Sequence, residues 1–291
     1  MTHHLPTTNV IRIVGITLLV MVVAKTGAAQ GARLGWSDTA ELTLVFTGGN
    51  AEATTLGLRN ELVGNWENSS VSVEISALRA QSSQTTRIAT GPSPLTFQVS
   101  TQTASTLTAE HYFAHSRYDR HLGGKTFWYI GAGWDRNTFA GFDHRYTGNS
   151  GVGHTWLEND MWIFKTAYGV GYTLQRDIAP APGGDDGFVG IRLSYEFKGQ
   201  VTPTTEFTSG LVADENLEKT SDFRTDLINA IAVDMTSQLA LKVSWQLLYD
   251  HLPSQVAIPL RLPSGDLTGD MVLTPLASVD QIVTFALVAS F

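Results

Sequence analysis

The chain has 291 residues, of which 43% are hydrophobic and 16% charged, with 19 basic and 27 acidic side chains. A net negative charge without a basic stripe argues against nucleic acid as a partner, and the absence of cysteine excludes disulfides, thiolate metal sites and a lipidated N-terminal cysteine. The 27 glycines and an aromatic content of 10% favour strands and tight turns over helices.

The N-terminal segment has the parts of a secretory signal. Arg12 precedes an apolar run over 13–24, and the small residues of "TGAAQG" follow it. A basic region, an apolar core and small residues before a cleavage point are typical of export signals, whereas a membrane-spanning helix needs about 20 apolar residues. We therefore predict a cleaved signal peptide over 1–29 and a single exported domain over 30–291.

Beyond the signal, apolar and polar residues alternate with a period of two, which predicts strands. The predicted strands read, in chain order, "TAELTLVF", "TTLGLRNELVGNW", "SVSVEISALRA", "TLTAEHYFAHSRY", "TFWYIGAGWD", "RYTGNSGVGHTW", "MWIFKTAYGVGYTL", "GFVGIRLSYEF", "TPTTEFTSGLV", "DFRTDLINAIAV", "LALKVSWQLLYD" and "QIVTFALVASF". Most run for about 9–12 residues, close to the length that a tilted strand needs to cross a bilayer. In the fourth strand the facing of the side chains stays ambiguous, because Glu110 and His111 are neighbours.

The two faces of these strands differ in polarity. One face is apolar with aromatic residues near its ends, and the other carries Thr, Ser, Gly and scattered charges. An apolar outside and a polar inside are typical of a membrane barrel, and a closed barrel pairs every backbone group in lipid. The sequence thus predicts an all-β fold, a transmembrane antiparallel up-and-down β-barrel of about 12 strands. Its predicted lumen charges are Glu41, Arg59, Glu74, Lys165, Arg192, Glu196 and Lys242.

The connections between the predicted strands alternate in length. Even-numbered connections such as "LEND", "KGQ" and "MTSQ" are short, and the odd-numbered ones except the first are long. This rhythm favours short periplasmic turns and longer external loops. The two longest segments, 81–104 and 252–277, are rich in Pro, Gly, Ser and Thr, so we expect solvent-exposed loops there.

The chain ends within its last strand, on Phe291. An apolar terminal strand is an aggregation hazard unless its edge is covered, so we expect it to close the barrel against the first strand. An aromatic residue is favoured at the membrane interface. Phe285, Leu287 and Phe291 also resemble the signal by which Gram-negative barrel-assembly machinery recognises outer-membrane proteins, although Ala289 stands where such signals often carry an aromatic residue. Besides that machinery, the expected partners are outer-membrane lipid and lipopolysaccharide.

Several stretches resemble the YdiY-like family of salt-induced outer-membrane proteins, also described as a domain of unknown function 481. They are "ELTLVFTGGNAEATTLGLRNEL", "FWYIGAGWDRNTFAGFDHRYTGNSGVGHTW", "LALKVSWQLLYDHLP" and the terminal strand. The resemblance covers nearly all of the mature chain and implies an outer-membrane location and a barrel fold, but no established reaction. The segment 250–280 is longer and more apolar than the resemblance leads us to expect.

One charged cluster brackets a predicted external loop: Asp135, Arg136, Asp143, His144 and Arg145. Asp135 and Arg145 would end adjacent strands on the lumen side, within reach of an ion pair. The cluster could bind a sugar phosphate or a divalent ion, or set charge selectivity at a pore mouth. Alternatively, it pins the loop by carboxylate–guanidinium bonds, which is the interpretation we favour.

The sequence shows no recognisable catalytic set. A lipase would need a serine with a positioned histidine and an acidic residue, and no His-x-Ser pair occurs. His115 and Ser116 are adjacent and therefore point to opposite faces. His111 and His115 share a face but lie about 13 Å apart along the strand, too far to share a metal ion. We predict no catalytic residue, no metal site and no cofactor.

Small residues recur in the predicted lumen, in "GAG", "GVG" and "GVGY". They either keep a narrow lumen open for water and small solutes or let the strands curve and close tightly. Our leading hypothesis is a small passive channel or an envelope-integrity protein under stress, with mixed lumen charge and weak selectivity among small solutes or ions. The alternatives are a surface ligand-binding or adhesive barrel and, less favoured, a lipid-modifying enzyme.

Overall fold

The computed structural model describes residues 34–47, 51–93, 96–179 and 187–291, and the predicted signal peptide lies outside them. Fourteen strands form in these residues. They are β1 (Gly35–Thr47), β2 (Ala51–Trp66), β3 (Ser69–Ser93), β4 (Thr96–Gly123), β5 (Thr126–Asn137), β6 (Phe142–Glu158), β7 (Trp162–Asp177), β8 (Gly187–Thr202), β9 (Thr205–Asn216), β10 (Phe223–Asp234), β11 (Leu239–Asp250), β12 (Gln255–Arg261), β13 (Leu267–Pro275) and β14 (Val279–Ser290). Among the described residues, no helix is long and apolar enough to cross a membrane.

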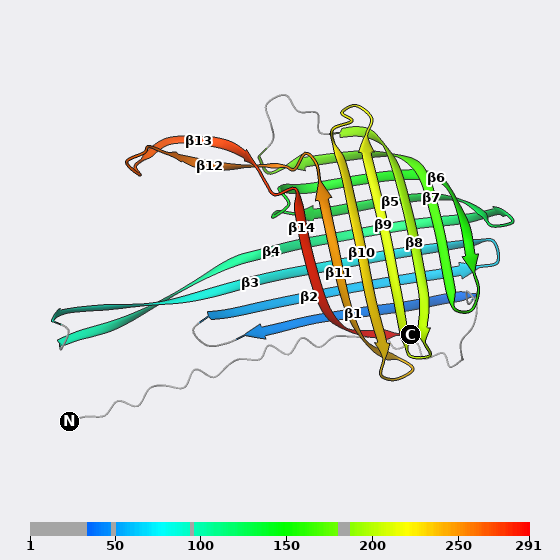
Figure 1. Ribbon diagram of the computed structural model, residues 1–291, viewed down its shortest axis with the longest axis horizontal. Helices are drawn as coiled ribbons and strands as arrows, with labels where there is room; N and C mark the ends of the chain where they lie inside the picture. The colour runs from blue at the N-terminus through cyan, green and yellow to red at the C-terminus, as the bar shows by residue number, and fades with distance from the viewer. Residues whose placement is uncertain (1–33, 48–50, 94–95, 180–186) are drawn as a thin grey trace.

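Twelve of these strands close into one antiparallel barrel, in the order β1-β14-β11-β10-β9-β8-β7-β6-β5-β4-β3-β2. The sheet therefore follows the chain from strand to strand, and only the hairpin of β12 and β13 stands apart from it (Figure 1). The predicted up-and-down barrel of about 12 strands is confirmed.

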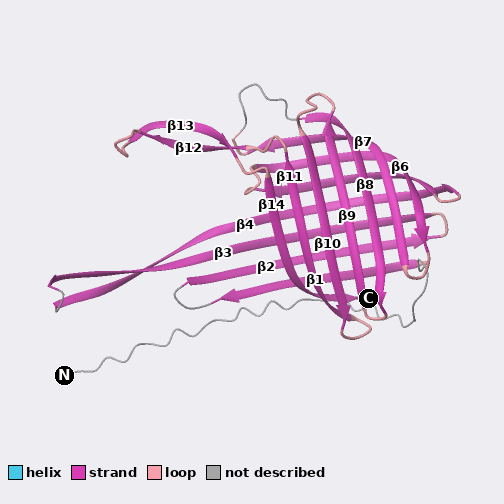
Figure 2. Ribbon diagram, in the orientation of Figure 1, coloured by secondary structure: helices cyan, strands magenta, loops and turns pink. Residues whose placement is uncertain are grey.

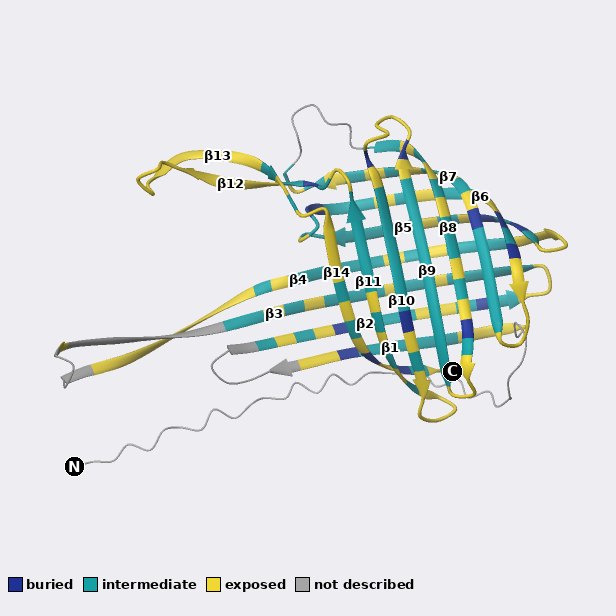
Figure 3. Cartoon of the chain, viewed as in Figure 1, coloured by how far each residue is buried: buried dark blue, intermediate teal, exposed yellow. Residues whose placement is uncertain are grey.

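Side chains alternate between the lumen and the outer surface, and the outer surface is apolar. On β7, Tyr168 and Val170 point outward with 44% and 59% of their surface exposed, whereas Ala167 faces inward and is buried. A similar alternation of exposed and less exposed residues occurs on β8 and β11, whereas β9 is of intermediate exposure along nearly its whole length (Figure 3). Trp36 and Trp66 add an edge-on aromatic pair, with ring centroids 5.5 Å apart, near one end of the outer surface. An apolar belt with aromatic residues at its border is the surface of a barrel embedded in lipid.

The two ends of the barrel differ, as the connection lengths predict. Tight turns such as 67–68, 124–125 and 203–204 join the strands at one end, here called the turn end. Gly123 and Gly124 adopt φ values of 119° and 59° in one of these turns, a conformation that glycine adopts without steric cost. The longer connections lie at the opposite end, here called the loop end.

The two segments expected to be exposed loops are instead β-structure. β3 pairs with β2 only as far as Gln84, and β4 pairs with β5 only from His111 onward. Between these limits β3 and β4 pair only with each other and form a two-stranded arm that extends well beyond the barrel (Figure 2). β12 and β13 form a second, shorter arm on the same side. The Thr and Ser residues that suggested a loop also suit exposed strands, because strand propensity depends on context.

The barrel closes through a short seam between β1 and β14. Only four register pairs join these strands, from Thr39 opposite Ser290 to Leu42 opposite Leu287, whereas β14 and β11 share eleven. Two backbone hydrogen bonds between Asp38 and Phe291, of 3.1 and 2.9 Å, extend the seam by one residue. The terminal Phe291 therefore belongs to the closing ladder. Its role in assembly, with Phe285 and Leu287, stays a prediction.

A cysteine pair can test this seam, because the natural chain has no cysteine. We expect Leu42→Cys with Leu287→Cys to form a disulfide on mild oxidation, since these outward residues are cross-strand partners. Leu44→Cys with Phe285→Cys is the matched control, because these residues lie beyond the last register pair. Gel mobility of the refolded barrel before and after reduction measures both. Equally efficient cross-linking of the control pair would show that the seam is longer.

Candidate functional site

A cavity of about 550 Å³ occupies the lumen. It extends from loop-end residues such as Phe139, Pro253 and Leu276 down to Arg117 and Tyr129. Its wall combines charged side chains with aromatic and aliphatic ones, so it differs from the predominantly apolar outer surface. This cavity is the candidate functional site.

An arginine–aromatic layer forms the floor of the cavity. The guanidinium carbon of Arg117 lies 4.2 Å from the ring centroid of Tyr129 and 5.7 Å from that of Phe127. Arg117 also donates from Nε to Asp119, at 2.7 Å. Tyr129 is 1% exposed, and Phe127 and Ala167 are buried with it. Arg117, Phe127 and Tyr129 are called the floor layer below.

The lumen glycines opposite the floor layer provide room for its rings. A Cβ atom at Gly153 would lie 2.2 Å from the ring of Phe127, and one at Gly169 would lie 2.5 Å from the Tyr129 hydroxyl. At Gly151 the obstruction is backbone, because a Cβ atom would lie 2.1 Å from the carbonyl oxygen of Tyr168. The glycines thus permit close approach of strands and rings, and they do not leave empty space at the floor.

The structure places all seven predicted lumen charges on the inner face. Lys242 on β11 forms an ion pair with Glu41 on β1, and Arg59 on β2 forms one with Glu74 on β3. Arg192 forms a bidentate pair with Asp214, at 2.7 and 2.9 Å, which the sequence did not suggest. The remaining two charges, Lys165 and Glu196, are cross-strand partners on β7 and β8.

Two lumen histidines converge on one carboxylate. Asp135 lies 3.1 Å from the Nε2 atom of His115 and 3.8 Å from that of His111. The distance between His111 and His115 along the strand is therefore a poor guide to whether their side chains share a partner, because both side chains lean toward Asp135 on the neighbouring strand. Within the described residues, no group of three or more His, Cys, Asp or Glu residues could hold a metal ion.

The predicted loop cluster divides between the two faces of the barrel. Asp135 and Arg145 are cross-strand partners on the lumen side, as expected, but no ion pair within 4 Å joins them in the described structure. Register shifts occur on both sides of the loop, between Asp135 and Asn137 and between Phe142 and His144. Arg136 and His144 face outward by simple alternation, because each is adjacent to an inward residue, and the shift beside Asp143 places this residue on the outer side as well.

Arg136, Asp143 and His144 instead form a rim contact on the outer side. Arg136 donates to Glu110 at 2.8 Å and to Asp143 at 3.1 Å. His144 lies 3.3 Å from Asp143 and accepts a 3.2 Å hydrogen bond from the indole of Trp134. These contacts join both ends of the β5–β6 loop to β4, so they hold the loop in place.

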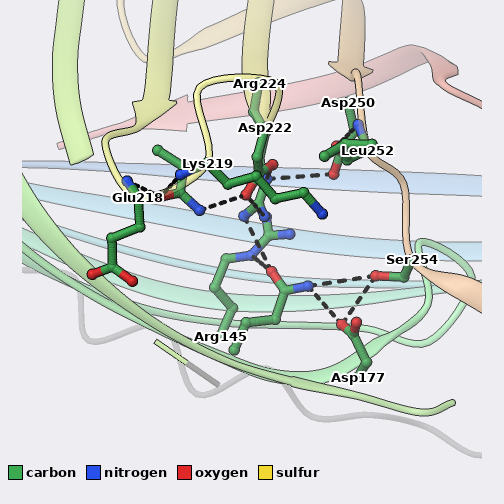
Figure 4. A network of polar contacts seen from close by, with 11 residues as sticks. Arg145, Asp177, Glu218, Lys219, Asp222, Arg224, Asp250, Leu252 and Ser254 are labelled. Atoms are coloured by element: carbon green, nitrogen blue, oxygen red, sulfur yellow. Dashed lines mark hydrogen bonds and ion pairs between the residues drawn. The ribbon is translucent and has the colours of Figure 1, made fainter. Parts of the chain in front are cut away.

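Gln175 on β7 connects several elements at the loop end. Figure 4 shows residues that it contacts, among them Arg145, Arg224 and Ser254. Its carbonyl oxygen accepts from Arg145 Nε at 2.8 Å and from Arg224 Nη1 at 3.2 Å. Its amide nitrogen donates to Asp177 at 2.6 Å and to Ser254 at 3.4 Å, and Ser254 also donates to Asp177. One amide therefore joins β6, β7, β10 and the segment after β11.

Arg224 extends this contact set across the lumen. It donates to Asp222 through two nitrogens, each at 3.1 Å, and lies 3.5 Å from Asp250. Its guanidinium carbon is 5.1 Å from the ring centroid of Phe188. The mouth network is defined as Arg145, Gln175, Asp177, Asp222, Arg224, Asp250 and Ser254. It lies at the loop end of the lumen, whereas the floor layer lies toward the turn end.

Sequence reasoning missed both the floor layer and most of the mouth network. The signal for Arg117 was present, because it follows His111 and His115 at even spacing on β4, but the facing of that strand was left open. Gln175 gave no signal, since a single amide on a strand is ordinary. Its importance arises only from contacts with β10 and with the segment after β11.

Comparison with solved structures gives several barrels of low similarity. The NanC porin is 11% identical, with a TM-score of 0.44, over 87% of this chain and 98% of that one. An outer membrane channel from Pseudomonas putida is 11% identical, with a TM-score of 0.42, over 92% of this chain and all of that one. The CymD monoaromatic hydrocarbon channel is 10% identical, with a TM-score of 0.38, over 89% of each chain. A comparison with curated proteins finds no match.

The sequence itself matches one family model, over residues 40–257, which is most of the chain. The match begins in β1 and ends in β12, so it includes the floor layer and the whole mouth network. The family expected from the strand and loop patterns is thereby confirmed: the chain belongs to the family described as "Protein of unknown function, DUF481".

Proposed function

We propose that this barrel is an outer-membrane channel for small polar solutes and ions, and that the floor layer is its narrowest part. The observation that carries the proposal is a charge-lined cavity of about 550 Å³ inside a barrel whose outer surface is apolar. Side chains that line the interior of a membrane barrel tune what passes through it. The outer-membrane location rests on the apolar belt and on the predicted export signal.

The lumen charges support weak selectivity. Most lumen cations have a carboxylate beside them, as in the pairs Lys242–Glu41, Arg59–Glu74 and Arg192–Asp214. Such pairs offset the charge of these cations locally, and carboxylates of the cavity wall outside the pairs, such as Asp226 and Asp280, leave a modest negative excess. We therefore expect neither cations nor anions to gain a large electrostatic advantage over the whole length.

Planar-bilayer recording of the refolded barrel tests the proposal. We expect small single-channel currents, because the floor layer is buried, and a reversal potential close to zero in a salt gradient. A refolded, heat-modifiable barrel that carries no current at any voltage would refute the channel function. Strong preference for one sign of ion would refute the account of paired charges.

A binding role at the surface is the second candidate, and the two arms favour it. β12 and β13 expose apolar residues beyond the barrel, among them Ile258, Leu260, Met271 and Leu273. Large exposed apolar patches mark interaction sites in many proteins. Deletion of 252–277 should abolish recognition of a surface partner while the barrel still inserts. Unchanged adhesion or ligand capture after that deletion would reject this role for the shorter arm.

A further inference from the structure

We propose that the cavity contains a subsite for a small organic anion, a compound with a carboxylate or phosphate group, and that Arg145 is its main charged contact. This inference deepens the proposed channel function and names the class of solute that the external half of the lumen retains. It rests on the contacts of Arg145, on the neighbouring Arg224 and on the composition of the cavity wall.

Arg145 is the cavity arginine that lacks an ion pair within the described residues. Arg117, Arg192 and Arg224 each have a carboxylate within 4 Å. The hydrogen bond that Arg145 makes is donated from Nε to the neutral amide of Gln175, at 2.8 Å. Its guanidinium carbon lies 4.0 Å from the ring centroid of Phe142, which holds the group in position by a cation–π contact.

A second guanidinium group shares the same acceptor. Arg224 Nη1 donates to the Gln175 carbonyl oxygen, so two cations converge on one uncharged atom. Like charges that are brought together in a partly buried site repel each other unless an anion lies nearby. Arg224 has Asp222 and Asp250 within 4 Å, whereas Arg145 forms no ion pair with a described carboxylate and is only more distantly compensated.

The carboxylates closest to this site are engaged elsewhere. Asp135, the cross-strand partner of Arg145, binds His115 and approaches His111. Asp177 accepts from the Gln175 amide and from Ser254. Arg145 therefore faces a cavity with Asp135, Asp177 and Asp250 near it but none of them within 4 Å. Its planar fork suits carboxylate and phosphate oxygens.

The cavity sets the size and the shape of the anion. A volume of about 550 Å³ lies within the range of small-molecule sites, roughly 300–1,000 Å³. Phe188, Tyr249 and Leu276 supply apolar wall next to the arginines. A compact anion with a partly apolar body fits this combination, because its charged group would contact Arg145 while its body packs against the wall.

Isothermal titration calorimetry on the full barrel, refolded in detergent, tests the subsite with three named probes. Inorganic phosphate and glucuronate are the anions, and glucose is the neutral control. We expect saturable binding of at least one anion and none of glucose. In Arg145→Gln the affinity for the anion should fall by about tenfold or more, which corresponds to about 1.4 kcal/mol. The affinity of Arg145→Lys should lie between those of the natural chain and of Arg145→Gln.

Arg176→Gln is the matched control variant. Arg176 is adjacent to Gln175 on β7 but belongs to the outer face and is exposed, so its loss removes the same charge at the same height outside the cavity. It should bind as the natural chain does. Heat-modifiable gel mobility verifies that each variant is folded. Absence of binding by both anions, or an unchanged affinity in Arg145→Gln, would overturn the subsite.

Calorimetry measures binding without an ion current, so the subsite proposal and the channel proposal can be refuted independently. A barrel that binds glucuronate but never conducts keeps the subsite and loses the channel. A barrel that conducts but binds neither anion keeps the channel and loses the subsite. Preference between the probes distinguishes the sources: phosphate alone indicates a free or lipid-borne phosphate group, and glucuronate alone indicates a carboxylated sugar.

Discussion

Tyr129→Ala is expected to increase the single-channel conductance of the refolded barrel severalfold. The ring of Tyr129 is the largest fully buried side chain in the described structure and lies in the lumen beneath the cavity. Its removal also deprives Arg117 of its stacking partner, 4.2 Å away, so that this side chain can swing aside. Both effects widen the same cross-section of the lumen.

Tyr129→Phe is the matched control for this experiment. The Tyr129 hydroxyl is buried and has no hydrogen-bond partner in the described residues. Loss of this hydroxyl removes a desolvated polar group and leaves the ring in place. We therefore expect Tyr129→Phe to conduct as the natural barrel does and to unfold at an equal or higher denaturant concentration.

The alanine variant also loses packing. Truncation of a buried aromatic ring to alanine costs about 3–5 kcal/mol in well-packed cores, so the unfolding midpoint of Tyr129→Ala should fall. Planar-bilayer recording measures the conductance, and urea titration of tryptophan fluorescence measures the stability. A folded Tyr129→Ala barrel with unchanged conductance would show that the narrowest part of the lumen lies elsewhere.

Most of the barrel was predictable from the sequence, because strand period and membrane physics act on every residue in the same way. Alternation assigns each side chain to one of two faces, and closure follows because lipid offers no partner for an open sheet edge. The two arms were not predicted, because the prediction of strands relied on an apolar face. Thr- and Ser-rich stretches such as 81–104 lack an apolar face, so nothing in the pattern separates an exposed ribbon from a loop.

The residues of the candidate site were predictable only where side chains alternate between the two faces of a strand without interruption. Asp135 and Arg145 fall on the lumen side because unbroken ladder connects them to the rest of β5 and β6. Next to the loop, a register shift places Asp143 on the outer side while Phe142 lines the cavity, and such bulges leave no clear mark in a sequence.

Contacts across the lumen cannot be predicted from the pattern of residues along a single strand. Gln175 on β7 meets Arg224 on β10, two strands that are not neighbours in the sheet. Which residues meet there depends on the curvature of the wall and on how far the segment after β11 reaches back to Ser254. Period and charge decide that a residue faces inward, but they do not decide what it meets.

Gly151→Ala should prevent the barrel from assembling, or leave it strongly destabilised. Gly151 on β6 is the cross-strand partner of Gly169 on β7. A Cβ atom at Gly151 would lie 2.1 Å from the carbonyl oxygen of Tyr168 and 2.6 Å from the Cα atom of Gly169. Both atoms are backbone, so no rotamer change relieves the collision, and β6 and β7 would have to separate at their hydrogen-bonded ladder.

Gly148→Ala is the matched control, because it adds the same methyl group to the same strand. Gly148 belongs to the outer face, and a Cβ atom there would meet nothing within 4 Å. Overpacking a tight site costs about 1–3 kcal/mol or more, whereas alanine at Gly148 should be neutral. The folded fraction after refolding, measured by heat-modifiable gel mobility, compares the two. Equal folding of both variants would mean that the β6 and β7 backbones yield readily, and that the lumen glycines serve chiefly to keep the passage open.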